Sequence, residues 1–342
     1  MAELKQIYNN AEPVSTPGEE ASFEAPPIPD ADAIVMEGKK RKRLNGFLRF
    51  RYLYFLMIPG VVWYICFHII PLYGLSMAFM DYQIPKGMQS DWVGFHNFEV
   101  LFANPEFWRL MGNTVKISAL KLVCGFPVPI ILALSVNAVG NRAFRKVAQT
   151  VSYLPNFISW VVIFGLSHIL FNEYTGVVAN VWDTLGLPYT DPSKNADTFV
   201  AFLVITSIWK GMGMSSIVYL AALSGIDVEL YEAAKVDGAS RFRQMLSITL
   251  PSIAPICAIV LTLNVGSLLG GDFEQIYLFQ GSNSELIRVS DIFDTWIYRN
   301  GLGAAGEYSM STALNLFKSA FGAILILLTN AGAKQLGYEG IW

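Results

Sequence analysis

Long apolar runs separated by short polar stretches dominate this chain from about residue 50 onward. A helix that crosses a bilayer needs roughly 20 mostly apolar residues. Six segments reach that length when isolated polar residues are tolerated, and they lie near residues 52–80, 110–139, 147–171, 198–223, 250–270 and 312–333. The pattern therefore predicts an all-α integral membrane protein with six transmembrane helices.

The beginning of the chain has a different pattern. Residues 1–38 contain five prolines, scattered acids and few apolar residues in any period, so this segment cannot bury enough surface to fold. The basic sequence KKRKR follows at residues 39–43. We therefore expect residues 1–44 to form a disordered acidic and proline-rich tail that ends in a basic cluster. Residues 45–342 then form the membrane domain.

The distribution of basic residues predicts how the spans are oriented. Lys and Arg beside a span favour the cytoplasmic side, so the KKRKR cluster places the N-terminus there. With six spans, residues 141–146, residues 225–249 and the C-terminus then also lie inside. The basic residues that fall in these inner segments are Arg142, Arg145, Lys146, Lys235, Arg241, Arg243 and Lys334. The outer loops hold scattered bases and more acids and aromatic residues, Asp272 among them.

Composition supports a membrane protein and excludes several other classes. The chain is 53% hydrophobic and 15% charged, and its mean hydropathy is +0.42, outside the usual balance of a soluble domain. A net charge of -3 gives no indication of nucleic-acid binding. The three cysteines lie in apolar runs and the three histidines have no ligand spacing, so we expect neither a disulfide framework nor a metal site.

One polar stretch interrupts the apolar half of the chain, YEAAKVDGASRFRQMLSITLP at residues 231–251. Its pattern predicts two short helices, the first capped by Asp227 and ended by Gly238 at a positive φ, the second capped by Ser240. Pro251 falls in the first turn of the fifth span, where its missing N–H costs little. The pair is either an amphipathic connector at the membrane surface or a docking element. Small residues that allow a partner close approach favour docking: Ala233, Ala234, Gly238 and Ala239.

The same stretch resembles the EAA loop of permease subunits in ATP-binding-cassette (ABC) importers. The resemblance rests on Glu232-Ala233-Ala234, then Gly238, then Ile248, Leu250 and Pro251. Three flanking stretches, WKGMGMSSIVYLAALSGID, YLPNFISWVV and YSMSTALNLFKSAFGAILILLTN, resemble the carbohydrate-uptake branch. More narrowly, they resemble oligosaccharide permeases of the alginate and rhamnogalacturonan type. The resemblance extends from about residue 45 to the end.

Membership of this family implies a type I ABC importer permease domain over residues 45–342, with residues 225–251 as the cytoplasmic coupling loop between helices 4 and 5. It implies the cytoplasmic (inner) membrane of a bacterium, a second related permease as a heterodimer partner, two ATP-binding subunits and an extracytoplasmic solute-binding protein. The cargo is then an oligosaccharide, with an acidic polysaccharide breakdown product as one option. By resemblance, the residues that contact the ATPase are Glu232, Ala233, Ala234, Asp237, Gly238, Phe242, Leu250 and Pro251.

The chain contains no GxxxxGK[ST] loop, so it does not cradle nucleotide phosphates in the usual way. We therefore expect ATP and Mg²⁺ to bind to the partner ATPase subunits, and this chain to hold no cofactor and to catalyse no reaction. Its partners are then these subunits, the binding protein, membrane lipid and the sugar.

Polar and aromatic residues inside the spans predict a substrate pathway, because polarity in a membrane is costly and marks a cavity or a helix interface. Aromatic faces stack on sugars while amides and charges bind their hydroxyls. The candidates are Asn156, Trp160, Trp209, Lys210, Asn264, Asn315 and Lys318. Helix packing is the alternative role for each of them. The two lysines face a partner permease, snorkel to an interface or meet an acidic sugar. Glycines and serines beside Lys210 predict a locally loosened fourth span.

Two other functions stay open at this stage. The EAA loop indicates that transport is driven by an ATPase, but it does not identify the transported solute. The same architecture could therefore import a peptide or a polyamine. An integral membrane sugar transferase is the second alternative. It would show acidic metal or phosphate motifs near a cytoplasmic loop, and Asp237 stands alone there.

Overall fold

The computed structural model describes residues 50–270, 272–303, 306–335 and 337. The predicted tail, residues 1–44, lies outside the described residues. The chain divides into two compact units, which meet between Ile70 and Pro71. Among the described residues, five helices are long and apolar enough to cross a membrane, and a bent helix pair brings the number to six.

The first unit contains α3 (Arg51–Tyr64), which continues into a π-helical turn (Ile65–Ile69). None of the side chains of α3 is buried, although the helix is strongly apolar. A helix that exposes apolar side chains on every face is typical of a membrane span, because lipid replaces the protein core as its solvent. It begins the first candidate span, Arg51–Phe79.

The second unit holds the remaining spans. Helices α5 (Pro105–Gly125) and α6 (Pro127–Ala138) form one span, and α10 (Ala196–Ser224) forms another. The next consists of α12 (Arg241–Gln244), a π-helical turn (Met245–Thr249) and α13 (Leu250–Gly266), and the last is α17 (Tyr308–Gln335). Local chemistry explains where α5 and α10 begin, because Asn104 and Asn195 each accept a hydrogen bond from a backbone N–H of the first turn.

The predicted third span, residues 147–171, is not one straight helix. It is divided into α7 (Arg142–Tyr153) and α8 (Trp160–Phe171), which a short 3₁₀ helix (Leu154–Phe157) joins at an angle of 101°. Pro155 lies in that joint and lacks the N–H that would continue the helix. The Ser159 side chain then accepts a hydrogen bond from the Val162 N–H and starts a new helix. The apolar pattern runs through this break, so periodicity alone could not find it.

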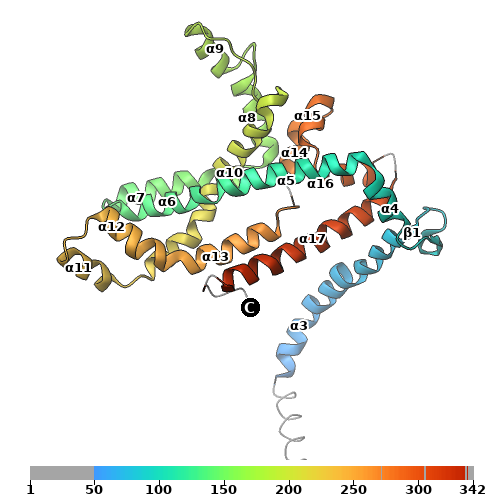
Figure 1. Ribbon diagram of the computed structural model, residues 1–342, viewed down its shortest axis with the longest axis horizontal. Coiled ribbons are helices and arrows are strands. Elements are labelled where there is room, and N and C mark those ends of the chain that lie inside the picture. The colour runs from blue at the N-terminus through green and yellow to red at the C-terminus, as the bar shows by residue number, and fades with distance from the viewer. Residues whose placement is uncertain (1–49, 271, 304–305, 336, 338–342) are drawn as a thin grey trace, which may run out of the picture. The chain divides into compact units, whose positions relative to one another are not determined.

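Helix α10 packs against α5, α6 and α13, and α13 packs against α17 (Figure 1). Shorter elements complete the unit: β1 (Met80–Asp81), β2 (Asp91–Trp92), α4 (His96–Ala103), α9 (Val177–Thr184), α11 (Val228–Val236), α14 (Phe273–Gln280), α15 (Ser284–Ser290) and α16 (Phe293–Ile297). The strands pair antiparallel, with Met80 opposite Trp92. One apolar cluster joins α10 to α14 through Phe199, Leu203 and Ile276, which are almost fully buried.

The fourth span is continuous, which contradicts the locally loosened helix expected from its glycines and serines. Gly213 instead allows close packing against α7: a Cβ built there would lie 1.9 Å from the backbone oxygen of Ser152. Gly211, two residues away, would place a Cβ in open space. Small residues at helix crossings let backbones approach in this way.

We expect Gly213→Ala to destabilise the protein by about 1–3 kcal/mol, because the added methyl overlaps a backbone carbonyl that side-chain rotation cannot move. Thermal unfolding of the detergent-solubilised protein measures the effect. Gly211→Ala is the matched control and should leave the midpoint unchanged or raise it slightly, since alanine is the better helix former. Equal midpoints for the two variants would contradict this account of the crossing.

A buried ion-pair cluster holds α5, α15 and α16 together. Asp291 is fully buried, and its two carboxylate oxygens accept hydrogen bonds from Arg299 at 3.2 and 2.7 Å. The Thr295 hydroxyl donates to the same carboxylate at 2.7 Å, and Arg109 lies 3.7 Å away. The hydrogen bond to Asp291 raises the pKa of Arg299 above its ordinary value, so the guanidinium stays charged.

Asp291→Ala should therefore cost about 1–3 kcal/mol in the free energy of unfolding, because the partly exposed Arg299 loses its charge-assisted hydrogen bonds and the buried Thr295 hydroxyl loses its acceptor. Asp91→Ala provides the comparison. Asp91 also pairs with a basic residue, Lys86 at 3.0 Å, but both side chains are exposed, so its loss should cost about 0–1 kcal/mol. Chemical denaturation measures both values, and a smaller loss for Asp291→Ala than for Asp91→Ala would refute the assignment.

Candidate functional site

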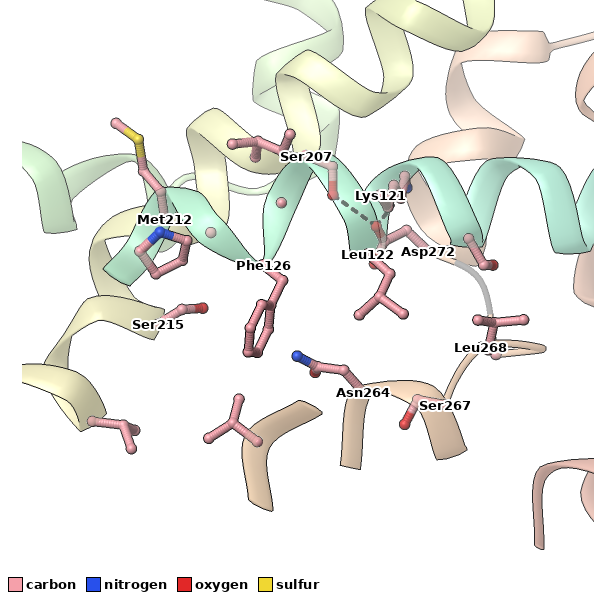
Figure 2. Close-up of a pocket in the computed structure, with 18 of the residues that line it drawn as sticks. Lys121, Leu122, Phe126, Ser207, Met212, Ser215, Asn264, Ser267, Leu268 and Asp272 are labelled. Carbon is pink, nitrogen blue, oxygen red and sulfur yellow. Dashed lines mark hydrogen bonds and ion pairs between the residues drawn. The ribbon is translucent and has the colours of Figure 1, made fainter. Parts of the chain in front are cut away.

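A cavity of about 480 Å³ lies between α5, the start of α6, α10 and the end of α13 (Figure 2). Its lining combines apolar side chains with hydroxyl, amide and charged groups. Cavities of this size accommodate small organic ligands. All of its lining residues belong to the second unit.

A hydrogen-bonded network of charged and polar residues forms one wall. The Lys121 ammonium on α5 lies 2.6 Å from an Asp272 carboxylate oxygen and 2.7 Å from the Gln275 side-chain oxygen. The Ser207 hydroxyl on α10 donates to the same Asp272 oxygen at 2.9 Å, and both contacts to Asp272 are drawn in Figure 2. Gln275 is buried, and its amide nitrogen donates to the Leu203 carbonyl at 2.8 Å. The network therefore connects α5, α10 and the beginning of α14.

Asp272 carries a negative charge at neutral pH despite its partial burial. Burial by itself raises the pKa of this carboxyl group. The Lys121 ammonium, the Ser207 hydroxyl and the more distant charge of Lys210 together outweigh that effect and hold the pKa of Asp272 below its ordinary value. The wall is thus an ionised pair rather than a neutral hydrogen bond.

The opposite wall comes from the end of α13 and offers uncharged polar groups. Asn264 and Ser267 lie there, and Figure 2 shows the Asn264 amide and the Phe126 ring extending into the same space. Ser215 on α10 adds a hydroxyl. An aromatic ring together with amide and hydroxyl groups is suited to a solute that has both hydroxyl groups and apolar C–H faces.

Of the residues predicted for the pathway, Asn264 lies in this cavity. Asn156, Trp160 and Lys210 meet at the bend between α7 and α8 instead. The Lys210 ammonium donates to the backbone oxygens of Asn156 at 2.9 Å and Ile158 at 2.5 Å, and it lies 5.5 Å from the centre of the Trp160 ring. Backbone carbonyls and a ring face thus solvate its charge.

The other three predicted residues lie apart from the cavity lining. Lys318 on α17 forms an ion pair with Asp294 on α16, and both side chains are largely buried. Trp209 and Asn315 are exposed side chains of α10 and α17. Their part in a pathway stays a prediction.

Sequence reasoning missed Lys121 and placed Asp272 only among the acids of an outer loop. A signal for Lys121 was present, because a lysine within an apolar span requires a partner or a cavity. The partner could not be identified from the pattern, since Asp272 is 151 positions away along the chain.

A second site is the exposed loop that joins α10 to α13. The structure confirms its local design: Asp227 accepts a hydrogen bond from the Glu229 N–H, Gly238 has φ +76°, and Ser240 accepts from the Arg243 N–H. Pro251 lies in the first turn of α13, as predicted. No residue of α11 or α12 is buried.

The loop exposes apolar side chains and is tied to the span that follows it. Val236 is 88% exposed and Phe242 is 66% exposed, so both apolar side chains are accessible to another surface. The Tyr231 hydroxyl on α11 lies 3.0 Å from the Thr249 hydroxyl, one residue before α13 begins. A displacement of α11 would therefore be transmitted to α13.

The fold and these two sites define a helical, multi-pass membrane protein with an internal polar cavity and an exposed helical loop. A family model described as "Binding-protein-dependent transport system inner membrane component" matches residues 125–336. The chain belongs to this family and is a permease subunit of an ABC transporter, not an enzyme. The resemblance found in the sequence is confirmed.

The individual relatives extend over most of the chain. The polygalacturonan/rhamnogalacturonan transport system permease protein YteP of Bacillus subtilis is 40% identical over 316 residues, 92% of this chain and 98% of its own. Protein LplB of the same organism is 40% identical over 90% of this chain and 96% of its own. A crystal structure of a bacterial alginate ABC transporter in complex with an alginate pentasaccharide-bound periplasmic protein contains a similar chain. That match has a TM-score of 0.79 and 35% identity, and it covers 87% of this chain and 99% of the other.

Proposed function

We propose that this chain forms part of the path along which an ATP-driven importer moves an oligosaccharide across a bacterial inner membrane. The observation that carries the proposal is the cavity between α5, α10 and α13, where Asn264, Ser267 and Phe126 face the Lys121–Asp272 pair. Hydroxyl, amide and aromatic groups around one cavity match the alternating polar and apolar faces of a sugar.

The relatives support a sugar rather than another cargo. The transport system of YteP is named for polygalacturonan and rhamnogalacturonan, and the matched crystal structure holds an alginate pentasaccharide on its periplasmic protein. Both names specify saccharides, and we extend that cargo class to this chain. A peptide or polyamine importer of the same architecture is the alternative, since the exposed loop is independent of cargo.

The partners follow from the same proposal. A solute-binding protein delivers the sugar from outside, a second related permease completes the membrane pathway, and two ATP-binding subunits hold ATP and Mg²⁺ below the membrane. Both chain termini and the α11–α12 loop then lie in the cytoplasm, in agreement with the basic residues of the inner segments.

We further propose that the α11–α12 loop receives the movement of an ATP-binding subunit. The exposed Phe242 and Val236 side chains offer apolar contacts to it, and the two helix caps keep the loop rigid. The hydroxyl contact between Tyr231 and Thr249 links the loop to α13. Because the far end of α13 carries Asn264, movement of the loop would reshape the cavity wall, as alternating access requires. The proposed contact residues are Glu232, Ala233, Ala234, Asp237, Gly238, Phe242, Leu250 and Pro251.

The cargo is tested with the complete transporter in proteoliposomes, supplied with its binding protein and a panel of solutes. We expect oligogalacturonates or related oligosaccharides to accelerate ATP hydrolysis and to accumulate inside the vesicles, because the loaded binding protein triggers the cycle. Peptides and polyamines of similar size are the controls and should do neither. Stimulation by a peptide or a polyamine, with none by any oligosaccharide, would overturn the proposed cargo.

The coupling role is tested with Gly238→Val. A β-branched residue at φ +76° is strained by about 1–3 kcal/mol and alters the turn that presents both helices, so transport per ATP hydrolysed should fall sharply. Gly186→Val is the matched control, because Gly186 also has a positive φ, +66°, and open space around it, but lies beyond α9. The Gly186 variant should bear similar backbone strain, whereas its transport per ATP hydrolysed should stay at the wild-type value. Normal coupling in the Gly238 variant would count against the loop as the contact.

A further inference from the structure

The surroundings of the charged wall carry more positive than negative charge, because Lys210 lies near the wall although it is not part of the cavity lining. Lys121 and Asp272 form an ion pair at 2.6 Å, and Lys210 is near enough for its charge to act on the same Asp272 carboxylate. Among the residues that the structure describes, no carboxylate forms an ion pair with Lys210, which is held by two neutral backbone oxygens. The lining therefore holds one ammonium group and one carboxylate, and the Lys210 charge acts on this pair from outside the lining.

An ammonium group without a counter-ion inside a membrane protein is costly, because the neutral carbonyls and ring face that contact Lys210 do not neutralise its charge. Anions that enter the cavity relieve that cost, whereas neutral solutes do not. The arrangement of this wall is thus better suited to a ligand with a negative charge than to a neutral one.

Lys121 is also positioned to contact a ligand. Its ammonium group has three N–H donors, of which one is directed to Asp272 and one to Gln275. Gln275 is itself fixed by hydrogen bonds to the Leu203 carbonyl and the Thr206 hydroxyl, each at 2.8 Å. Lys121 lines the cavity, so its third donor has access to a bound solute.

We propose that Lys121, supported by the charge of Lys210, binds the carboxylate of an acidic sugar unit as the oligosaccharide passes through the cavity. Asp272 competes with the sugar for Lys121. The Lys121 ammonium is paired with Asp272 when the cavity is empty, and it pairs with the sugar carboxylate when the sugar is bound. Uncharged groups on the facing wall, including Asn264 and Ser267, bind the hydroxyls of the same sugar. This inference rests on the proposed function and names the residues that distinguish acidic from neutral cargo.

The alternative is that the Lys121–Asp272 pair only ties α5 to the start of α14. The two roles predict different results for the two halves of the pair. If the pair is structural, removing either charge breaks the same bond and both variants are impaired alike. If Lys121 binds the sugar, removing Lys121 impairs transport, whereas removing the Asp272 charge frees the ammonium and does not.

The experiment measures uptake of trigalacturonate by the complete transporter in proteoliposomes, with saturating loaded binding protein. Lys121→Gln should lower uptake roughly 10- to 100-fold, the effect of losing a hydrogen bond to a charged group. Lys121→Arg keeps the cation and should retain most of the uptake. Asp272→Asn should equal or exceed the wild type; Asp272 makes no side-chain cap to α14, so the helix start is not lost with its charge.

Lys116→Gln is the matched control for loss of positive charge on the same helix. Lys116 is exposed and is not part of the cavity lining, so its replacement should change uptake little. Unfolding temperatures of all variants establish that the complexes are assembled.

The inference would be overturned if Lys121→Gln and Asp272→Asn lowered uptake of trigalacturonate equally. Wild-type uptake by Lys121→Gln would also overturn it, as would a loss of uptake in Lys116→Gln as large as that in Lys121→Gln. A neutral oligosaccharide control separates this result from the proposed function. If the wild type imports neutral galactan oligosaccharides but not trigalacturonate, the proposed function stands and the inference is wrong. If the wild type imports no oligosaccharide of either kind, the proposed function itself is wrong.

Discussion

The structure depends on one constraint, that a polar side chain within an apolar helix needs a partner inside the protein, because lipid provides none. Three lysines satisfy this constraint in three different ways. Lys318 pairs with Asp294, Lys210 is held by backbone carbonyls and lies near the face of an aromatic ring, and Lys121 pairs with Asp272 at the wall of the cavity. Only the last arrangement leaves a charged group facing an open space. Polar groups that would destabilise isolated helices thus gather where a solute can use them.

The same helix reaches both sites, which is the connection that the proposed drive by a partner subunit requires. Helix α13 begins beside Thr249, which contacts α11 of the exposed loop, and it ends at the cavity wall that carries Asn264. Helix α13 runs unbroken from Leu250 to Gly266 although Pro255 lies inside it, so one helix connects the loop to the cavity wall. Near its end, Gly266 packs closely against Ile326 on α17.

Features with local causes could be predicted from the sequence. The two short helices of the loop follow from capping by Asp227 and Ser240 and from the positive φ of Gly238, each of which involves residues a few positions apart. The spans follow from apolar run length, a property of single segments. The bend at Pro155 was missed although its cause is also local, because the apolar residues continue on both sides and conceal the change of direction.

The sequence by itself determined the class of protein, the number of apolar segments, the two short helices of the α11–α12 loop and the absence of a nucleotide-binding motif. Tertiary structure alone decided which polar residues face one another. Lys121 and Asp272 meet across 151 positions, and Lys210 and Lys318 are drawn away from the cavity by partners on other helices. The physical reason is that helical periodicity specifies the face of a helix on which a residue lies, whereas the neighbour of that face is set by packing among all the spans.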